Sequence, residues 1–308
     1  MIIRLQAVGD MAMVAQLLYG VALANPDCSF TLLSQPFLTA LLFNPPANME
    51  AMVMDTKREE RFVWGVLKFS YRLRRERLNE VIDLQCSWRS ALVRTYARLF
   101  GAKPYKVHMG RRAAPSKLEQ YSEVLRRAGL KVPTELPLLH VSRDVRMAMQ
   151  NMFPTYKQFE QRIWLGIAPF AQDSAKVYPA DRMNRLIEML MESHRYVVFL
   201  FGAPGSEAEA LSAYEHRYPD VLNTAGVLSL AESLAIMQRL HLLVAMDSGS
   251  PHLAALVGVR SLTIWRSTRP EDGSVAYAHR AEDDLFDTPQ TPLNPECIYA
   301  RILALTEK

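Results

Sequence analysis

Residues 240–264 decide the fold, and they read LHLLVAMDSGSPHLAALVGVRSLTI. The apolar run 240–245 has the length of a buried strand, and 251–257 has the composition of a helix whose first turn suits Pro251. A second strand-like run follows at 260–264. A strand, a helix and a strand in this order form a βαβ unit, in which the two strands are parallel members of one sheet.

The same alternation extends outward along both halves of the chain. Expected strands are residues 2–6, 29–33, 52–54, 81–84, 163–168 and 196–201, and expected helices are 11–24, 59–78, 87–100, 180–193, 207–217 and 229–238. The polar segment 143–161, with Pro154, interrupts this alternation of strands and helices and is the linker candidate. The pattern predicts an α/β protein of two doubly wound domains, 1–150 and 151–290, with a C-terminal helix in 291–308 that could pack back across their junction.

Length and composition agree with two soluble domains. A chain of 308 residues corresponds to about two domains of ordinary size. Its 49% hydrophobic and 22% charged residues are typical of globular proteins. The formal net charge of +4 excludes a histone-like or acidic-tail protein, but it conceals an asymmetry. Residues 57–117 contain 16 Lys and Arg against 5 Asp and Glu, whereas 268–308 contain 4 against 8.

The cysteines and the N-terminal segment bear on location. Cys28, Cys86 and Cys297 are an odd number and form no CxxC pair, so they indicate neither a disulfide framework nor a zinc site and suit a reducing cytoplasm. The apolar run 11–24 has some features of a signal peptide, but an acidic residue precedes it directly and it is too short to span a bilayer. We therefore expect a cytoplasmic protein without a cleaved signal.

Three loops at expected strand ends carry residues suited to chemistry, because ligands of open α/β sheets bind where the strands end. The first loop contains Gly9 and Asp10. An aspartate just before a helix can be a helix cap, its commoner role, or a general base. The GxGxxG pattern is absent, so this is not a dinucleotide-binding loop.

The second loop, Asp247-Ser248-Gly249-Ser250-Pro251-His252, combines small residues with a helix start. Its backbone N–H groups could bind a phosphate, and His252 could reach the same ligand. An ordinary strand-to-helix turn with a core histidine explains the pattern equally well. The third loop, 168–176, ends in Lys176, which could neutralise a diphosphate or simply be solvated. Two loops suited to phosphate binding are expected at the same edge of one sheet, and this favours the phosphate-binding interpretation of each.

Together these motifs resemble those of the heptosyltransferase family, glycosyltransferase family nine, whose members include the ADP-heptose:lipopolysaccharide heptosyltransferases. The resemblance covers about residues 1–270. It rests on Ile3-Arg4-Leu5 with Val8-Gly9-Asp10, on Lys176 before Tyr178-Pro179, on Val81-Ile82-Asp83-Leu84-Gln85 with Arg89-Ser90, and above all on Asp247-Ser248-Gly249 with His252-Leu253-Ala254-Ala255.

The resemblance implies a GT-B fold, with two Rossmann-like domains facing across a cleft, and inverting sugar transfer from a nucleotide-diphospho-sugar without a required metal or cofactor. The N-terminal domain would bind the acceptor and the C-terminal domain the donor. By position, Asp10 would be the general base and Lys176 would hold the donor diphosphate. Asp247 would contact the sugar, Ser248 and Gly249 would offer N–H groups to phosphate, His252 would shape the site, and Glu207 would contact the ribose. Gln172 would lie in the donor phosphate loop, where family members often have hydroxyl residues.

This chemistry is consistent with the residues. Inversion needs one base opposite the leaving group, so no pair of glycosidase-like carboxylates is required. The basic segment 57–117, including Arg89, Arg111 and Arg112, would face an anionic acceptor such as a phosphorylated glycolipid at the inner face of the inner membrane. Four further arginines in this segment are expected to be solvated on a helix face: Arg72, Arg74, Arg75 and Arg77. No nucleic-acid recognition motif accompanies the charge.

The chain departs from the family pattern after its last predicted strand. Where the family commonly has a Gly-Pro-Thr turn, this chain has Trp265-Arg266-Ser267-Thr268-Arg269-Pro270. Arg266 and Arg269 would alter the donor pocket, which fits a donor other than ADP-heptose or a weakened enzyme. Two other functions share the architecture: a non-catalytic protein that binds nucleotide sugars or glycans, and a sugar-nucleotide epimerase.

Overall fold

The computed structural model describes residues 1–107, 116–141, 161–271 and 275–307. The chain divides into two compact units, Met1–Pro137 (unit 1) and Leu138–Lys308 (unit 2). The domain boundary predicted at residue 150 lies outside the described residues, as does nearly all of the predicted linker 143–161. Both units are built on parallel sheets, as the alternating pattern predicts.

Unit 1 contains a five-stranded sheet in the order β3-β2-β1-β4-β5. Its strands are β1 (Ile2–Ile3), β2 (Phe30–Ser34), β3 (Met49–Val53), β4 (Glu80–Asp83) and β5 (Lys103–Lys106), and its helices are α1 (Val8–Ala24), α2 (Val63–Leu73), α3 (Trp88–Leu99) and α4 (Lys117–Arg127). Short 3-10 turns lie at Thr39–Leu41 and Arg74–Glu76. Every pairing is parallel, and the order 3-2-1-4-5 is that of the first five strands of a Rossmann sheet.

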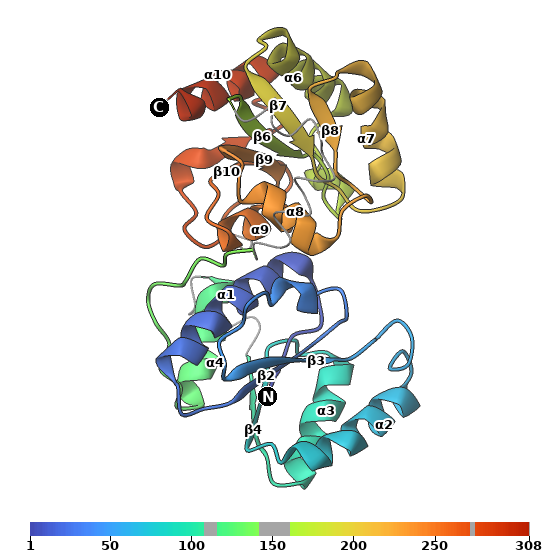
Figure 1. Ribbon diagram of the computed structural model, residues 1–308, viewed down its shortest axis with the longest axis vertical. Helices are drawn as coiled ribbons and strands as arrows, with labels where there is room; N and C mark the ends of the chain where they lie inside the picture. Colours follow the sequence, from blue (N-terminus) through green and yellow to red (C-terminus); the bar gives the residue numbers. More distant parts are fainter. Residues whose placement is uncertain (108–115, 142–160, 272–274, 308) are drawn as a thin grey trace. The chain divides into compact units, whose positions relative to one another are not determined.

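Helices cover both faces of this sheet (Figure 1), with α1 packed on α4 and α2 packed on α3. The reason is the apolar face that each helix carries. In α2, Val66, Phe69 and Leu73 recur at helical spacing and are buried with Val93 of α3 against the strands. Helix α1 is buried along almost its whole length, which explains why its sequence reads as a continuous apolar run rather than as an amphipathic one.

Unit 2 contains a six-stranded sheet in the order β11-β10-β9-β6-β7-β8. Its strands are β6 (Ile163–Ala168), β7 (Tyr196–Leu200), β8 (Val221–Asn223), β9 (Leu242–Met246), β10 (Ser261–Trp265) and β11 (Asp284–Phe286), and its helices are α6 (Ala180–Glu192), α7 (Ser206–Arg217), α8 (Leu230–Met237), α9 (Ser250–Leu256) and α10 (Pro295–Thr306). Counted from β6 the order is 3-2-1-4-5-6, the full Rossmann order.

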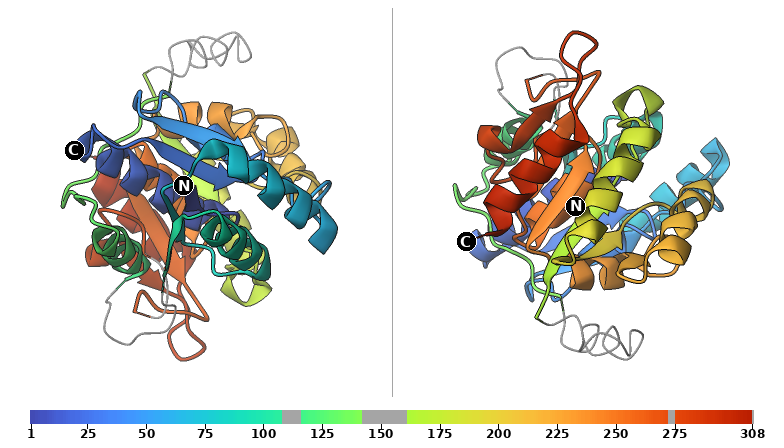
Figure 2. Two further views of the ribbon diagram at one scale, coloured as in Figure 1. Left: turned by 90° about the horizontal axis from the view of Figure 1, so that it is seen from below. Right: turned by 90° about the horizontal axis from the view of Figure 1, so that it is seen from above.

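The core of unit 2 lies between this sheet and three helices. Side chains of α6, α7 and α10 join strand residues in one buried cluster that includes Ile298 and Ile302. Strands β7 and β9 are buried at every position, as expected of parallel strands covered on both faces. Helix α10 packs side by side with α6 (Figure 2), so the C-terminal helix predicted in 291–308 is present and contributes to this core.

Some expected boundaries are wrong. The turn predicted at Gly9-Asp10 does not precede the helix, because α1 already begins at Val8 with Ala7 at the N-cap position. The helical pattern 59–78 yields a shorter α2, from Val63 to Leu73. Several short or weakly apolar elements escaped prediction: β5, β8, β11 and α4. Strand β5 reads Lys-Pro-Tyr-Lys and is mostly exposed, so no apolar run marks it.

Candidate functional site

The loops predicted to carry chemistry in unit 2 leave the sheet at its switch point. The strand order reverses between β6 and β9, and ligands of doubly wound sheets bind beside the carboxyl ends of strands at such a point. The loop after β6 leads to the 3-10 turn Ser174–Lys176, and the loop after β9 begins at Asp247. Asp173 fixes the first loop, since its carboxylate accepts a hydrogen bond from the N–H of Ala175 at 3.0 Å.

Lys176 and Asp247 meet in an ion pair, although 71 positions separate them. Lys176 Nζ lies 2.6 Å from Asp247 Oδ2, and the Thr268 hydroxyl donates to the same oxygen at 2.6 Å. The carboxylate is thus anchored by two donors, while the ammonium has donors to spare for an anionic ligand. The prediction that these two loops share one edge is confirmed, and Thr268 is a member that the motif analysis missed.

The small residues after Asp247 form a tight entry into α9. The Ser248 hydroxyl accepts a hydrogen bond from the N–H of Ser250 at 3.3 Å, and Gly249 occupies the N-cap position. Pro251 stands in the first turn, where the missing N–H costs nothing. His252 is buried, as a core histidine would be, and it also lines a cavity; its contact with a ligand stays a prediction.

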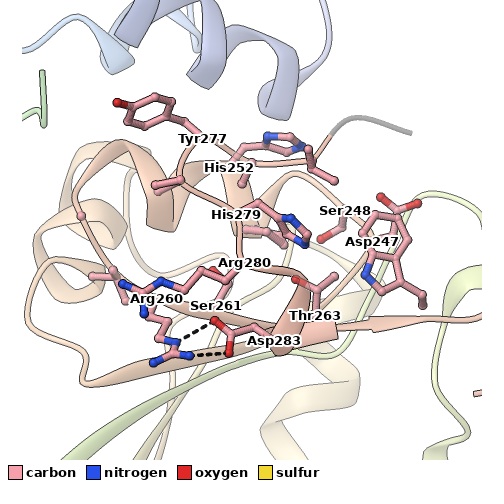
Figure 3. A pocket seen from close by; sticks show the side chains of 18 of the residues that line it. Asp247, Ser248, His252, Arg260, Ser261, Thr263, Tyr277, His279, Arg280 and Asp283 are labelled. Atoms are coloured by element: carbon pink, nitrogen blue, oxygen red, sulfur yellow. Dashed lines mark hydrogen bonds and ion pairs between the residues drawn. The ribbon is translucent and has the colours of Figure 1, made fainter. Parts of the chain in front are cut away.

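That cavity has a volume of about 240 Å³ and lies within unit 2, under the segment 275–283. Figure 3 shows Asp247 and Ser248 toward one end and the ion pair of Arg260 with Asp283 toward the other. Arg260 contacts Asp283 through Nε at 2.6 Å and Nη2 at 2.7 Å, a two-point geometry that holds the floor of the cavity rigidly. A cavity of this size can accept part of a nucleotide sugar but not all of it.

A second carboxylate helps to shape the cavity wall. Asp284 Oδ1 accepts hydrogen bonds from Trp265 Nε1 at 2.6 Å and from His279 Nε2 at 2.9 Å. Trp265 and His279 both line the cavity. Asp284 therefore fixes the orientation of two ring side chains that a bound sugar or base would meet.

The other predicted donor residues lie on neighbouring loops. Gln172 is exposed on the loop after β6. Glu207 stands in the first turn of α7, where its carboxylate accepts a hydrogen bond from the N–H of Ala203 at 2.7 Å. Glu207 therefore ties the loop after β7 to its helix.

The two arginines of the divergent turn have partners of their own. Arg266 Nε lies 2.7 Å from Asp287 Oδ2, and Arg266 Nη1 donates to the carbonyl oxygen of Val177. Arg269 lies over the ring of Phe286 at 4.7 Å. Asp287 is almost fully buried and also pairs with Arg182, so a structural ion pair accounts for Arg266.

Unit 1 has its own charged cluster at the switch point between β1 and β4. Asp10 Oδ2 lies 2.5 Å from Arg4 Nη2, and Asp10 Oδ1 lies 3.2 Å from Lys117 Nζ. The Tyr121 hydroxyl donates to Oδ1 at 3.4 Å. The cap role considered for Asp10 is wrong, because Ala7 holds the N-cap position and cations hold the carboxylate.

Arg4 is the anchor of this cluster. It is 4% exposed and donates from Nη1 to the carbonyl oxygen of Leu84 at 2.7 Å and to the Tyr121 hydroxyl at 2.9 Å. Burial raises the pKa of the Tyr121 phenol above its usual range, so the phenol stays protonated and remains a donor to Asp10. Arg4 lies in the motif that resembles the family, whereas no sequence signal marks Lys117 and Tyr121.

The loop after β4 supports the cluster from the neighbouring strand. Gln85 Oε1 accepts hydrogen bonds from the N–H groups of Leu5 and Gln6, both at 2.9 Å. Asp83 is fully buried, pairs with Arg94 and accepts hydrogen bonds from the N–H groups of Gln85 and Cys86. These bonds fix the chain on both sides of the switch point, next to Asp10.

The residues predicted to bind the acceptor are only partly placed. Arg89 donates to the carbonyl oxygens of Glu60 at 3.2 Å and Arg61 at 2.8 Å, so it holds the segment before α2. Arg111 and Arg112 lie outside the described residues. The four arginines expected to be solvated are exposed, Arg72, Arg74, Arg75 and Arg77, but only Arg72 lies on α2, because this helix ends at Leu73.

Two further properties concern metals and membranes. Among residues 1–107, 116–141, 161–271 and 275–307, no group of three or more His, Cys, Asp and Glu side chains is arranged to hold a metal ion. In the same part of the chain, no helix is both long enough and apolar enough to cross a bilayer.

Two Rossmann-like sheets, each with a charged cluster at its switch point, form the α/β architecture of the GT-B fold, and comparison with solved structures agrees. The fold matches the solved structure of E. coli ADP-heptose lps heptosyltransferase II with a TM-score of 0.78, at 20% identity over 99% of this chain and 97% of that one. It matches a glycosyltransferase family 9 structure from Veillonella parvula with a TM-score of 0.83, at 18% identity over 100% and 97%.

The family follows from the sequence comparisons. Residues 66–293 match the model of glycosyltransferase family 9 (heptosyltransferase), so the chain belongs to this family and is a glycosyltransferase. Lipooligosaccharide heptosyltransferase 2 of Haemophilus influenzae is 24% identical over 292 residues, covering 86% of this chain and 82% of that protein.

Proposed function

We propose that this enzyme moves a heptose or a related sugar from a nucleotide-diphospho-sugar to a lipopolysaccharide-like or other surface glycan acceptor. Transfer inverts the anomeric centre and requires no metal. The names of two similar proteins, an ADP-heptose lps heptosyltransferase and a lipooligosaccharide heptosyltransferase, support this choice of donor and acceptor. The family match to residues 66–293 supports the reaction class.

The observation that carries the donor side is the meeting of Lys176 with Asp247 at the unit 2 switch point, 2.6 Å apart. As the bond from the sugar to the diphosphate breaks, negative charge gathers on the leaving phosphate. A lysine already placed at this edge can stabilise that charge without reorganisation. Asp247, held by Thr268 as well, can bind a sugar hydroxyl from the same position while Lys176 turns toward the phosphate.

The acceptor side rests on Asp10 of unit 1. Its carboxylate takes the proton of the acceptor hydroxyl as the oxygen attacks the anomeric carbon from the face opposite the diphosphate. Arg4 and Tyr121 orient this carboxylate, and the Lys117 side chain, which is 37% exposed, covers it. An incoming acceptor would displace Lys117, because Lys117 is the most exposed member of the cluster. Its ion pair with Asp10, at 3.2 Å, is also longer than the ion pair between Arg4 and Asp10, at 2.5 Å.

The acceptor of such an enzyme is an anionic glycolipid, and the basic segment 57–117 suits it. Action on a lipid-linked glycan also implies a cytoplasmic protein that works at the inner face of the inner membrane. Neither role requires nucleic acid.

The test is turnover of a panel of nucleotide-diphospho-sugars with an anionic lipid-linked glycan acceptor, for wild type, Asp10→Asn and the matched control Asp27→Asn. Asp27 is an exposed aspartate of the same unit. We expect Asp10→Asn to lose about 10²- to 10⁴-fold in kcat while the control keeps its rate, in buffers with and without a chelator. An Asp10→Asn enzyme at full rate would refute the base role.

The same panel separates the other functions. A thermal-shift screen of nucleoside diphosphates and their sugars identifies the base before the sugar is known. Stabilisation by a nucleotide sugar without product on any acceptor would replace the proposal by a non-catalytic binding protein. A change in the donor's stereochemistry without acceptor would replace it by an epimerase.

A further inference from the structure

The outer face of α2 in unit 1 exposes aromatic side chains that a water-soluble surface rarely shows. Trp64 is 82% exposed and the preceding Phe62 is 68% exposed. Tyr71, two turns further along the helix, is also exposed. Contiguous exposed aromatics on one element mark an interaction surface rather than chance.

Helical spacing separates these residues from the core. The buried side chains of α2 are Val66, Phe69 and Leu73. Trp64, Lys68 and Arg72 recur every four residues along the outer side and therefore form a single stripe. We call this stripe, with Phe62, Tyr71 and Arg75, the α2 face. Its charge is one-sided, because residues 61–77 hold six Lys and Arg against one acid, Glu76.

The α2 face continues onto the neighbouring helix α3, which packs beside it (Figure 1). At the start of α3, the exposed Trp88 carries the Arg89 guanidinium over its ring at 4.3 Å. Arg89 in turn donates to the carbonyl oxygen of Arg61 at 2.8 Å, next to Phe62. At the other end, a shallow groove lined by Arg74, Arg77, Tyr96 and Phe100 joins the two helices. The exposed aromatic and basic side chains thus span both helices.

Arginine and aromatic rings alternate over this surface in stacked pairs. Arg61 lies over Phe62 at 5.3 Å and Arg74 over Tyr71 at 4.0 Å. Such a pair presents an apolar ring and a cation together, as the boundary between lipid acyl chains and anionic headgroups requires. A single-stranded nucleic acid would use the same charges and could stack its bases on the rings, but no nucleic-acid recognition motif accompanies them in the sequence.

We propose that the α2 face docks the enzyme on an anionic lipid bilayer, with Trp64 and Phe62 inserted at the headgroup level and the arginines on the lipid phosphates. Exposed tryptophan and other aromatic side chains locate at the headgroup level of a membrane, and each basic residue near anionic lipid adds to the attraction. The inference extends the peripheral association of the proposed function by assigning it a surface, and it does not depend on the transfer reaction.

The test is flotation of the full chain with vesicles of phosphatidylglycerol and phosphatidylethanolamine, compared with phosphatidylcholine alone, without donor or acceptor. We expect wild type to partition about tenfold or more in favour of the anionic vesicles, and raised salt to weaken this preference. Two double variants divide the surface into its parts: Phe62→Ser with Trp64→Ser, and Arg72→Glu with Arg75→Glu. Each should lower partitioning about tenfold.

Matched controls carry the same changes elsewhere on unit 1. Leu23→Ser removes an apolar side chain that is 64% exposed, and Lys131→Glu reverses an exposed charge. Both should keep the partitioning of wild type, and the thermal melting of every variant verifies that it is folded. Tryptophan emission gives a second readout, because Trp164 and Trp265 are buried. Trp88 is exposed as well, so brominated lipid should quench wild type and spare the variant Trp64→Phe with Trp88→Phe.

Several results would overturn the assignment. Equal binding to both vesicle types, or unchanged binding by the two double variants, would show that the α2 face is not the docking surface. Binding of single-stranded nucleic acid without binding of vesicles, or concentration-dependent self-association that shields Trp64, would assign it to another partner. A separate assay measures turnover of a lipid-free acceptor fragment by wild type and by the double variants. If the proposed transferase activity is wrong, wild type shows no turnover either. If only the docking assignment is wrong, wild type still turns over the fragment.

Discussion

Replacement of Lys176 by methionine tests whether the donor site works through charge. The methionine fills a similar volume but cannot pair with Asp247, whose Oδ2 lies 2.6 Å from Lys176 Nζ. The carboxylate is not orphaned by this change, because Thr268 still donates to the same oxygen at 2.6 Å. The variant therefore removes a cation from the predicted position of the diphosphate while leaving the surrounding loops supported.

The expected loss of activity is large. Loss of one preorganised group that faces a developing oxyanion costs about 10²- to 10³-fold in kcat. The effect should fall mainly on kcat, because the charge on the leaving phosphate is greater in the transition state than in the bound donor. Lys176→Arg keeps the charge on a planar group of different reach, so it should recover only part of the rate.

The expected loss of stability is small by comparison. A hydrogen bond to a charged group contributes about 1.5–3 kcal/mol, and here the ammonium remains one-quarter exposed while Thr268 keeps one bond. We expect a loss of about 1–2 kcal/mol, or a fall in Tm of about 2–8 °C if unit 2 melts as one body. Such a loss leaves the enzyme folded at assay temperature.

The assay measures kcat and KM for the donor together with Tm. Arg266→Met is the matched control, since it breaks an ion pair of similar length, 2.7 Å, to the buried Asp287 in the same unit. Two results would refute the reasoning: a control that loses as much kcat as Lys176→Met, or full recovery of rate when Asp247→Asn is added to Lys176→Met. The first would make stability the cause, and the second would mean that Lys176 only neutralises Asp247.

Three further predictions follow from other parts of the structure. Arg4→Lys keeps the charge but replaces the two guanidinium nitrogens, of which Nη1 reaches Leu84 and Tyr121 and Nη2 reaches Asp10, by one compact ammonium. We therefore expect kcat to fall about 10- to 100-fold with donor KM unchanged, and an unaltered kcat would show that Arg4 does not position the base. Gly166→Ala places a Cβ 2.5 Å from a Leu240 methyl group, so urea unfolding should show a loss of about 1–3 kcal/mol, and an unchanged midpoint would contradict the close packing. Burial, with Asp83 as a smaller cause, raises the pKa of the Cys86 thiol, so its thiolate forms at higher pH. In a variant that retains only this cysteine, the pH midpoint of the alkylation rate should lie above that of a cysteine peptide. A midpoint at or below that of the peptide would contradict the raised pKa.

The meeting of the two unit 2 loops at one sheet edge could be predicted because each loop is marked by its local sequence. Asp247 and Lys176 each directly follow or close a loop after an apolar strand, and parallel topology brings such loops to one edge. Thr268 lies on the same edge for the same reason, after β10. The turn that contains Thr268 differs from the family pattern through Arg266 and Arg269. These two arginines were therefore the evident candidates, and the threonine between them was not.

The Asp10 cluster shows why the remainder could not be predicted. Lys117 and Tyr121 are separated from Asp10 by 107 and 111 positions, and they lie on α4, a helix with no strong apolar run. Arg4 is nearer, but an arginine inside an apolar strand is usually read as a surface residue. Burial of its guanidinium depends on three partners from three elements, and such an arrangement leaves no periodic signal.

The ion pairs at the two switch points differ in which partner is more deeply buried. In unit 1 the cation is the anchored member of the ion pair, since the Arg4 side chain is 5% exposed and that of Asp10 is 13% exposed. In unit 2 the acid is anchored, since the side chain of Asp247 is 12% exposed and that of Lys176 is 25% exposed. Within these two pairs the more accessible charge is therefore the carboxylate in unit 1 and the ammonium in unit 2, although the second cation on Asp10, Lys117, is 37% exposed. An accessible carboxylate suits the removal of a proton from an acceptor, and an accessible ammonium suits a leaving diphosphate. Once the acceptor displaces Lys117, as proposed, Asp10 is the most accessible charge of its cluster, which agrees with the proposal that unit 1 takes the acceptor and unit 2 the donor.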